Sequence, residues 1–292
     1  MALEKKVKPE GKMKDFLNSR AKGTRVIGVA ERYIISKPPE DEGRRTDVLH
    51  PSAMVKLDWC HRGSYYQLLG HKPPKSKYPP SLRMYNVFET GHATHARWQN
   101  LFRDMGKIWG RWECLVCKES YVGFAVDHLA HPVVDQVYKE VPLHSSRLNM
   151  VGHSDGILVG FEEPLMLEVK TIGPGTFRYE APDIYYPNNG DVEKMWKAVV
   201  SPFAGHVAQV QIYMKLAEFM NVPYQPQEAL LLYENKATGD YKEFVVPKSD
   251  FAIKHLFDAA EMISKAVYDL EPPYCNIGGA KGCPQCKEYD NV

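Results

Sequence analysis

The stretch GHSDGILVGFEEPLMLEVKT, residues 152–171, contains two short apolar runs separated by a polar segment. Short apolar runs bounded by Gly, Pro and polar residues are typical of β-strands. We therefore predict strands at 156–161 and 165–171, joined as an antiparallel hairpin with its turn near 161–163. Further strands are expected near 138–143, 229–234 and 241–247.

The polar side chains of this hairpin are predicted to converge at one end. Strand side chains alternate, so Glu168 and Lys170 share one face while Val169 points to the opposite, buried one. Antiparallel pairing then puts Asp155 opposite Glu168 or Lys170. Two close carboxylates need a shared proton or a cation, and an oxygen site of this kind favours Mg²⁺ or Mn²⁺. Such an ion polarises a phosphate and activates water, which indicates metal-assisted phosphodiester hydrolysis.

Helical segments are predicted on both sides of these strands. Apolar spacing favours helices at 51–70, with Cys60 inside, at 85–104, at 203–220 and at 249–270. Residues 173–202 are rich in Pro, Gly and aromatic residues and predict a long loop. The mixture of strands and helices indicates an α/β protein.

Four motifs occur in order along the chain: Gly91-His92-Ala93-Thr94-His95, Gly152-His153-Ser154-Asp155, Glu168-Val169-Lys170 and Gln209-Val210-Gln211-Ile212-Tyr213. Their order and spacing resemble the PD-(D/E)xK nuclease superfamily, in particular its RecB-like branch. The stand-alone CRISPR-associated and phage-encoded iron–sulfur exonucleases are the most similar form. The resemblance implies a restriction-endonuclease-like core, with a central mixed β-sheet flanked by helices.

The resemblance also implies a role for each matching residue. The implied ligands of a catalytic Mg²⁺ or Mn²⁺ are three side chains and one backbone carbonyl: His95, Asp155, Glu168 and Val169. Lys170 would position the nucleophilic water. Gln209 and Tyr213 lie four residues apart on one helical face, from which both can reach substrate or the lysine.

Cys60 precedes the motifs, and Cys275, Cys283 and Cys286 follow them. This arrangement resembles the [4Fe-4S] site of the same exonucleases and implies that the four thiolates join the two ends of the core. The spacing Cys-x7-Cys-x2-Cys departs from the family, in which the close pair usually comes first. Zinc is an alternative, since four thiolates suit it equally well, and free buried thiols are another.

Cys114, Cys117, His128 and His131 form a separate pattern, Cys-x2-Cys-x10-His-x2-His. Sulfur and nitrogen ligands at short spacings favour tetrahedral zinc. The histidine spacing is shorter than in a common zinc finger, so ordinary core cysteines beside surface histidines remain the alternative. The segment 106–135, which contains these four residues, is therefore a possible zinc-binding insertion.

The chain has 292 residues, 37 Lys and Arg against 36 Asp and Glu, and 44% hydrophobic residues, which predicts a globular protein. We divide it into a basic arm and linker at 1–48, a nuclease core at 49–270 and a cysteine segment at 271–292. No apolar run is long enough for a membrane span and no secretory leader is evident, so we expect a cytoplasmic protein, or one of the host cytoplasm if phage-encoded.

The sequence therefore predicts a metal-dependent deoxyribonuclease, by resemblance an exonuclease on DNA ends or single strands that serves recombination, repair or replication. No nucleotide-binding Gly-x-x-x-x-Gly-Lys-Ser/Thr motif is present, so unwinding would need a separate helicase. Two alternatives stay open: an inactive DNA-end-binding or assembly protein with the nuclease fold, and a zinc-stabilised adaptor whose Glu-x-Lys is a surface salt bridge. Digestion polarity, strand preference and oligomeric state are not indicated.

Overall fold

The structure, a computed structural model, describes residues 26–36, 45–71, 81–287 and 289. Two compact units are present, one formed by residues 1–43 and 76–89 and the other by residues 44–75 and 90–292. The described part of the first unit consists of α2 (Ile27–Ser36) and the beginning of α5 (Leu82–Asp104). The predicted basic arm falls almost entirely outside the described residues, and the division at 48 and 270 stays a prediction.

The second unit is built on one mixed β-sheet. Among the described residues its strands run in the order β2-β1-β6-β7-β8-β9, with β3 also paired to β1. Their bounds are β1 Ile108–Cys114, β2 Ser120–Gly123, β3 Gln136–Tyr138, β6 Gly156–Leu158, β7 Leu165–Ile172, β8 Glu228–Asn235 and β9 Tyr241–Pro247. Only β7 and β8 pair in parallel. The predicted central mixed sheet is confirmed.

The hairpin predicted from residues 152–171 is also confirmed, as β6 and β7. Gly156 pairs with Leu167, so Asp155, one residue before, stands opposite Glu168. The glycine at 156 has a packing reason, because a Cβ there would lie 2.7 Å from Cδ1 of Ile108 on the neighbouring strand. The register thus places both carboxylates at the same end of the hairpin.

Apolar side chains of β7 and β8 cover both faces of the sheet, because alternate residues point to opposite sides. On one face Met166 and Leu231 pack in a large core with Ile212 of α9 (Ala204–Phe219). On the other face Leu167 and Val169 pack with Phe102 of α5. Helices therefore flank the sheet on both sides, which fixes the strands that carry Glu168 and Lys170.

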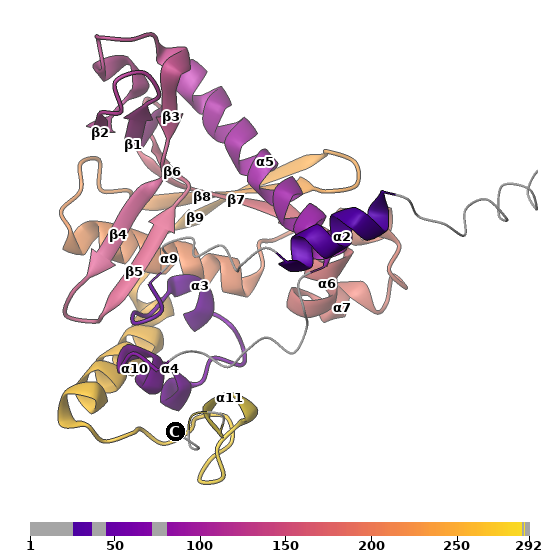
Figure 1. Cartoon of the computed structure of the whole chain (residues 1–292), viewed down its shortest axis with the longest axis vertical. Helices are drawn as coiled ribbons and strands as arrows, with labels where there is room; N and C mark the ends of the chain where they lie inside the picture. Colours follow the sequence, from indigo (N-terminus) through magenta and orange to yellow (C-terminus); the bar gives the residue numbers. More distant parts are fainter. Residues whose placement is uncertain (1–25, 37–44, 72–80, 288, 290–292) are drawn as a thin grey trace, which may run out of the picture. The chain divides into compact units, whose positions relative to one another are not determined.

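A small hairpin and the helices α4 (His61–Leu68), α10 (Asp250–Asp269) and α11 (Pro284–Lys287) also belong to this unit. The two-stranded sheet of β4 (Val141–Ser145) and β5 (Met150–Ser154) packs against α9. The helix α10 lies beside α9 and also beside α4, although almost two hundred residues separate α4 from α10 (Figure 1). The last helix, α11, also packs on α4.

The prediction of one helix over 51–70 is wrong. The segment forms α3 (Pro51–Met54) and α4, and Cys60 lies between them as the N-cap of α4. Its sulfur accepts a hydrogen bond from the Gly63 N–H at 3.3 Å and so caps the start of α4, whereas α3 has already ended at Met54. The spacing of apolar residues cannot reveal this break, because both helices have the same α-helical period.

The predicted loop at 173–202 instead contains three short helices, α6 (Pro174–Glu180), α7 (Pro182–Tyr185) and α8 (Val192–Ala198). Pro174 and Pro182 occupy first helical positions, and the Asp191 side chain accepts from the Lys194 N–H. These residues are signals for the start of a helix. They are missed from the sequence because the abundance of Pro and Gly indicates a loop. In the described residues no helix has the length and apolar character needed to cross a membrane.

Candidate active site

Asp155 is the centre of the candidate site. It lies between the end of β5 and the start of β6 and is almost fully buried. Its Oδ2 accepts from the Val169 N–H at 2.6 Å, while Nδ1 of His95 lies 2.9 Å from its Oδ1. The Gln99 amide, one helical turn beyond His95 on α5, donates to the Asp155 carbonyl at 3.2 Å. Asp155 is thus held in place from the hairpin and from the helix.

The second group of polar side chains links β7 to α9. Nζ of Lys170 lies 2.7 Å from Oε1 of Glu168 and donates to Oε1 of Gln209 at 3.0 Å. The Gln209 amide nitrogen in turn donates to Glu168 at 3.1 Å and to the Tyr213 hydroxyl at 2.8 Å. Gln209 therefore fixes the separation of the carboxylate and the ammonium. The four predicted residues of this group are brought together.

Gly152 on β5 explains how the hairpin of β4 and β5 comes so close to α9. A Cβ at this position would lie 2.7 Å from Cε1 of Tyr213 and 3.1 Å from Cγ of Pro51. Any larger residue would push the Tyr213 ring away and disturb its hydrogen bond with Gln209. The glycine of the second motif and the tyrosine of the fourth are therefore in direct contact.

Glu140 is a site residue that the sequence analysis missed. Its carboxylate, the His95 imidazole and the Asp155 carboxylate each offer a ligand atom, and these atoms all lie within 4.8 Å of one another. Glu140 interrupts the predicted strand 138–143 in the left-handed region, with φ of 60°, and separates β3 from β4. Its carbonyl accepts from the Arg111 N–H on β1 at 3.3 Å. A single glutamate outside any motif gave no signal in the sequence.

Burial and mutual repulsion change how these groups bind protons. The pKa of Glu168 is raised to about 7 because burial disfavours the charged form, although Lys170 opposes this shift. Burial, together with the charges of Asp155 and Glu168, likewise raises the pKa of Glu140 to about 7. Burial alone would lower the pKa of Lys170, but the negative charges of Glu168, Asp155 and Glu180 together outweigh it and the net shift is upward. The site concentrates negative charge that a cation would relieve.

The donor set fits Mg²⁺ or Mn²⁺. His95, Glu140 and Asp155 supply one imidazole nitrogen and two carboxylates that lie close together. Glu168 lies opposite Asp155 on the neighbouring strand. Hard carboxylate oxygens with one imidazole suit these ions better than softer metals. The described contacts involve the N–H of Val169, and the role of its carbonyl as a ligand stays a prediction.

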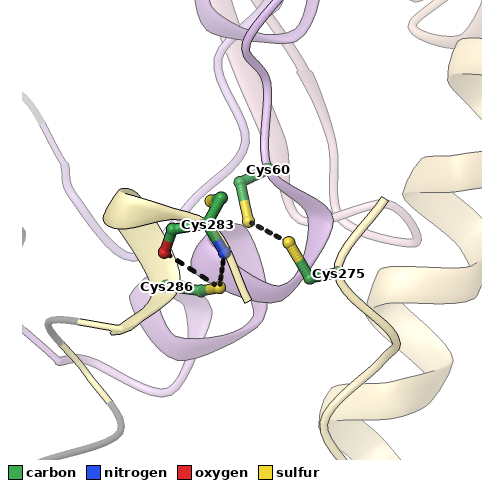
Figure 2. A group of neighbouring side chains, drawn as sticks. All are labelled: Cys60, Cys275, Cys283 and Cys286. Atoms are coloured by element: carbon green, nitrogen blue, oxygen red, sulfur yellow. Dashed lines mark hydrogen bonds between the residues drawn. The ribbon is translucent and has the colours of Figure 1, made fainter. Parts of the chain in front are cut away.

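A separate set of potential metal ligands is the four-cysteine cluster, formed by Cys60, Cys275, Cys283 and Cys286. All four side chains are buried, and their sulfur atoms lie within 4.8 Å of one another. Figure 2 shows Cys60 and Cys275 pointing toward each other, with a separation of 3.8 Å between the sulfurs. N–H groups of Gly63, Gly278 and Cys283 donate to the sulfurs of Cys60, Cys275 and Cys286. In the metal-free chain burial still raises the pKa of Cys60 and Cys286, whereas hydrogen bonds such as that from Gly278 lower the pKa of Cys275 to about 6.

The side chain of Asn276 fastens the same segment to the start of α4. It accepts from the His61 N–H at 2.9 Å and donates to the Trp59 carbonyl at 3.0 Å. The predicted meeting of residue 60 with the C-terminal cysteines is thus present. The donor set fits either an iron–sulfur cluster or one zinc ion. The 3.8 Å separation equals the edge, roughly 3.8 Å, of a thiolate tetrahedron around a single zinc ion.

The structure also brings together the Cys/His cluster, Cys114, Cys117, His128 and His131. This cluster belongs to the turn after β1 and to the segment between β2 and β3. The sequence-predicted side chains therefore fall into three groups: the acidic site, the four-cysteine cluster and the Cys/His cluster. The acidic site comprises His95, Asp155, Glu168, Lys170, Gln209 and Tyr213, and Glu140 is its additional member.

No known family profile and no curated protein matches the chain. Among solved structures, an alkaline exonuclease (LHK-Exo) from Laribacter hongkongensis is 11% identical over 77% of this chain and 90% of its own, with a TM-score of 0.43. The LHK-Exo complex with dAMP gives 13% identity over the same shares, also with a TM-score of 0.43. The crystal structure of SSO0001 gives 12% over 90% and 88%, with a TM-score of 0.36. These values are low, so the functional assignment rests on the side-chain geometry.

Proposed function

We propose that the chain is a divalent-metal-dependent deoxyribonuclease that hydrolyses phosphodiester bonds at DNA ends. The observation that carries the proposal is the arrangement around Asp155, which receives contacts from His95 and from Val169 and stands opposite the Glu168–Lys170 pair. Carboxylates for a cation and an ammonium for charge at phosphate are the groups that this chemistry requires.

His95, Glu140, Asp155 and Glu168 would hold the Mg²⁺ or Mn²⁺. When bound, the ion supplies a Lewis acid for the phosphate and lowers the pKa of the attacking water. Lys170 keeps its proton at neutral pH because its pKa is raised. Its Nζ therefore donates hydrogen bonds to a water or a phosphate oxygen and does not serve as the base.

Gln209 and Tyr213 act on the lysine and the glutamate from α9. Gln209 accepts from Lys170 and donates to Glu168, which holds both side chains at the end of β7. Tyr213 accepts from the Gln209 amide and so fixes its orientation. These two residues position the reacting groups, and their removal should weaken catalysis less than removal of Glu168 or Lys170.

The finer parts of the proposal come from the resemblance of the four motifs. They are exonuclease action on ends or single strands, service in recombination, repair or replication, and a location in the cytoplasm, of the host if phage-encoded. The four-cysteine cluster would be structural whether it holds [4Fe-4S] or zinc, because it shares no residue with the group formed by His95, Glu140 and Asp155.

The test uses end-labelled single- and double-stranded DNA with anaerobically purified protein in Mn²⁺, Mg²⁺ or EDTA. Glu168→Ala is compared with Glu243→Ala, an exposed glutamate on β9. We expect metal-dependent degradation by the wild type and by Glu243→Ala, no degradation by Glu168→Ala, and resistance of covalently closed circles. Equal cleavage by Glu168→Ala would reject the site. Binding of DNA ends without cleavage by folded, metal-loaded wild type would favour the end-binding protein instead.

A further inference from the structure

The Cys/His cluster takes no part in the proposed hydrolysis, yet its four side chains converge closely. Sγ of Cys114 lies 3.5 Å from Nδ1 of His131, and Sγ of Cys117 lies 3.4 Å from Nε2 of His128. The two ring nitrogens, Nε2 of His128 and Nδ1 of His131, are 3.3 Å apart. Hydrogen bonding alone does not explain why two thiols and two imidazoles share one centre.

These separations match the edges of a zinc tetrahedron. With Zn–S bonds of roughly 2.3 Å and Zn–N bonds of roughly 2.0–2.1 Å, a tetrahedral ion places sulfur roughly 3.5 Å from nitrogen. The same geometry places two nitrogens roughly 3.3 Å apart. The described edges of the cluster therefore enclose the volume of one such ion. Two sulfur and two nitrogen ligands in this geometry select zinc among the common metals.

The backbone around the two cysteines is already shaped for a metal ligand pair. The Lys118 N–H donates to the Cys114 carbonyl at 2.9 Å, and the Cys114 N–H donates to the Glu119 carbonyl at 2.9 Å. Lys118 takes a left-handed conformation with φ of 63°, so the turn closes immediately after Cys117. Both sulfurs consequently project from one tight turn between β1 and β2.

The histidines also have neighbours suited to a ligand. The Glu119 carboxylate lies 3.6 Å from Nδ1 of His128, the ring nitrogen that does not face Cys117. A carboxylate on that side favours the tautomer whose Nε2 lone pair binds metal. The Tyr121 ring stacks on His128 with centroids 5.3 Å apart and restricts its rotation.

The segment between β1 and β3 has few buried apolar side chains. Between residues 115 and 135 only Gly123 and Ala125 are fully buried. Six aliphatic side chains in the same segment are exposed: Leu115, Val116, Val122, Val126, Leu129 and Val134. Segments this small commonly depend on a metal when burial of apolar surface cannot offset chain entropy.

We propose that Cys114, Cys117, His128 and His131 bind one structural zinc ion that holds the insertion between β1 and β3 closed. All four positions are occupied by protein ligands, so the ion has no open position for substrate or water. The site is separate from the acidic site and from the four-cysteine cluster, and it stands whether or not the chain is a nuclease.

The first test measures zinc per chain by mass spectrometry of the metal in the purified full-length protein. We expect Cys117→Ala and His128→Ala each to contain one equivalent less than wild type. His255→Ala, which removes an exposed histidine of α10, should retain the zinc content of the wild type. Unchanged zinc in both Cys117→Ala and His128→Ala would overturn the proposal.

A second test needs no variant and so does not depend on folding of the mutants. Cys117 is exposed, whereas the other three ligands are more buried. Alkylation of wild-type protein, mapped by peptide mass spectrometry, should therefore be slow at Cys117 and accelerate at least tenfold after zinc is removed by a chelator. Equal alkylation with and without chelator would overturn the proposal, because a bound thiolate is protected from the reagent.

Discussion

The acidic site and the four-cysteine cluster use opposite ways of assembling ligands. At the acidic site, side chains from a hairpin and two helices already satisfy one another through hydrogen bonds, as between Asp155 and Val169 or Lys170 and Gln209. The four-cysteine cluster contains sulfur donors, all buried, from residue 60 and residues 275–286. In the proposed function a cation at the first arrangement would be able to leave and return, whereas a metal at the second would stay bound.

The difference separates the region that we propose carries activity from the region that we propose carries stability. A metal between Cys60 and Cys275 links residues 215 positions apart and so restricts the unfolded chain strongly. A metal at the acidic site joins elements that the sheet and its two cores hold already. Changes at the two regions should therefore have separable effects, and the following experiments order them by expected size.

The largest effect is expected from Glu168→Gln. The amide keeps the shape and can still hydrogen-bond Lys170, but it removes a charged ligand, so the cleavage rate should fall by about 10³-fold or more. Initial rates and thermal melts of the same preparation check this. A melting temperature within a few degrees of wild type is expected, and a rate within tenfold of wild type would contradict the separation of the two regions.

The second effect is a loss of stability without a direct loss of catalysis. Cys283→Ala removes one of four buried ligands, so the bound metal should be lost and the melting temperature should fall by about 10 °C or more. Lys281→Ala, an exposed position of the same segment, is the matched control.

Iron content and visible absorption of the wild type decide between [4Fe-4S] and zinc in this cluster. Retained metal and unchanged melting in Cys283→Ala would show that the cysteines are free buried thiols. Activity per folded molecule, measured well below the melting temperature, should remain within a few-fold of wild type.

A smaller effect is expected from Glu140→Gln. The residue completes the group with His95 and Asp155, so its neutralisation should weaken Mn²⁺ binding by about 10- to 100-fold. The Mn²⁺ dependence of cleavage should shift to higher concentration, with most of the rate recovered at saturation. Glu113→Gln on β1 is a suitable control, and an unchanged Mn²⁺ dependence would exclude Glu140 from the site.

The smallest effect concerns pH. In the metal-free protein the pKa values of Glu140 and Glu168 are raised to about 7, above those of the unfolded chain. Protonation then favours the folded state below the unfolded pKa, and this stabilisation is lost as pH rises through about 7. Lys170 and His95 oppose the upward shift in the pKa of Glu168, and burial outweighs them.

The melting temperature of the metal-free protein should therefore be lower at pH 8 than at pH 5. The double variant Glu140→Gln/Glu168→Gln should show a flatter profile. Mn²⁺ binding near pH 6.5 should release protons, which calorimetry in buffers of different ionisation enthalpy measures. A steeper fall in the double variant would contradict the raised pKa values.

Three residues of the acidic site, Asp155, Glu168 and Lys170, could be predicted to meet because they lie on one hairpin. Alternation along residues 165–171 placed Glu168 and Lys170 on one face and put Asp155 opposite one of the two, and the register of the structure selects Glu168. His95, Gln209 and Tyr213 followed from the motifs and not from periodicity. The two sets of cysteine and histidine ligands were likewise recognisable from residue type and spacing.

Glu140, the break at Cys60 and the three helices within 173–202 could not be predicted in the same way. Glu140 reaches His95 only because β3 pairs with β1 and β4 begins in a new direction, and both depend on packing. The helical path is broken between Met54 and Cys60, and the C-terminal segment meets this break, where Asn276 donates to the Trp59 carbonyl. By itself the sequence determined side-chain direction within each element, because that direction depends on local backbone period. Only the tertiary structure decided which elements meet, because those contacts join residues far apart in the chain.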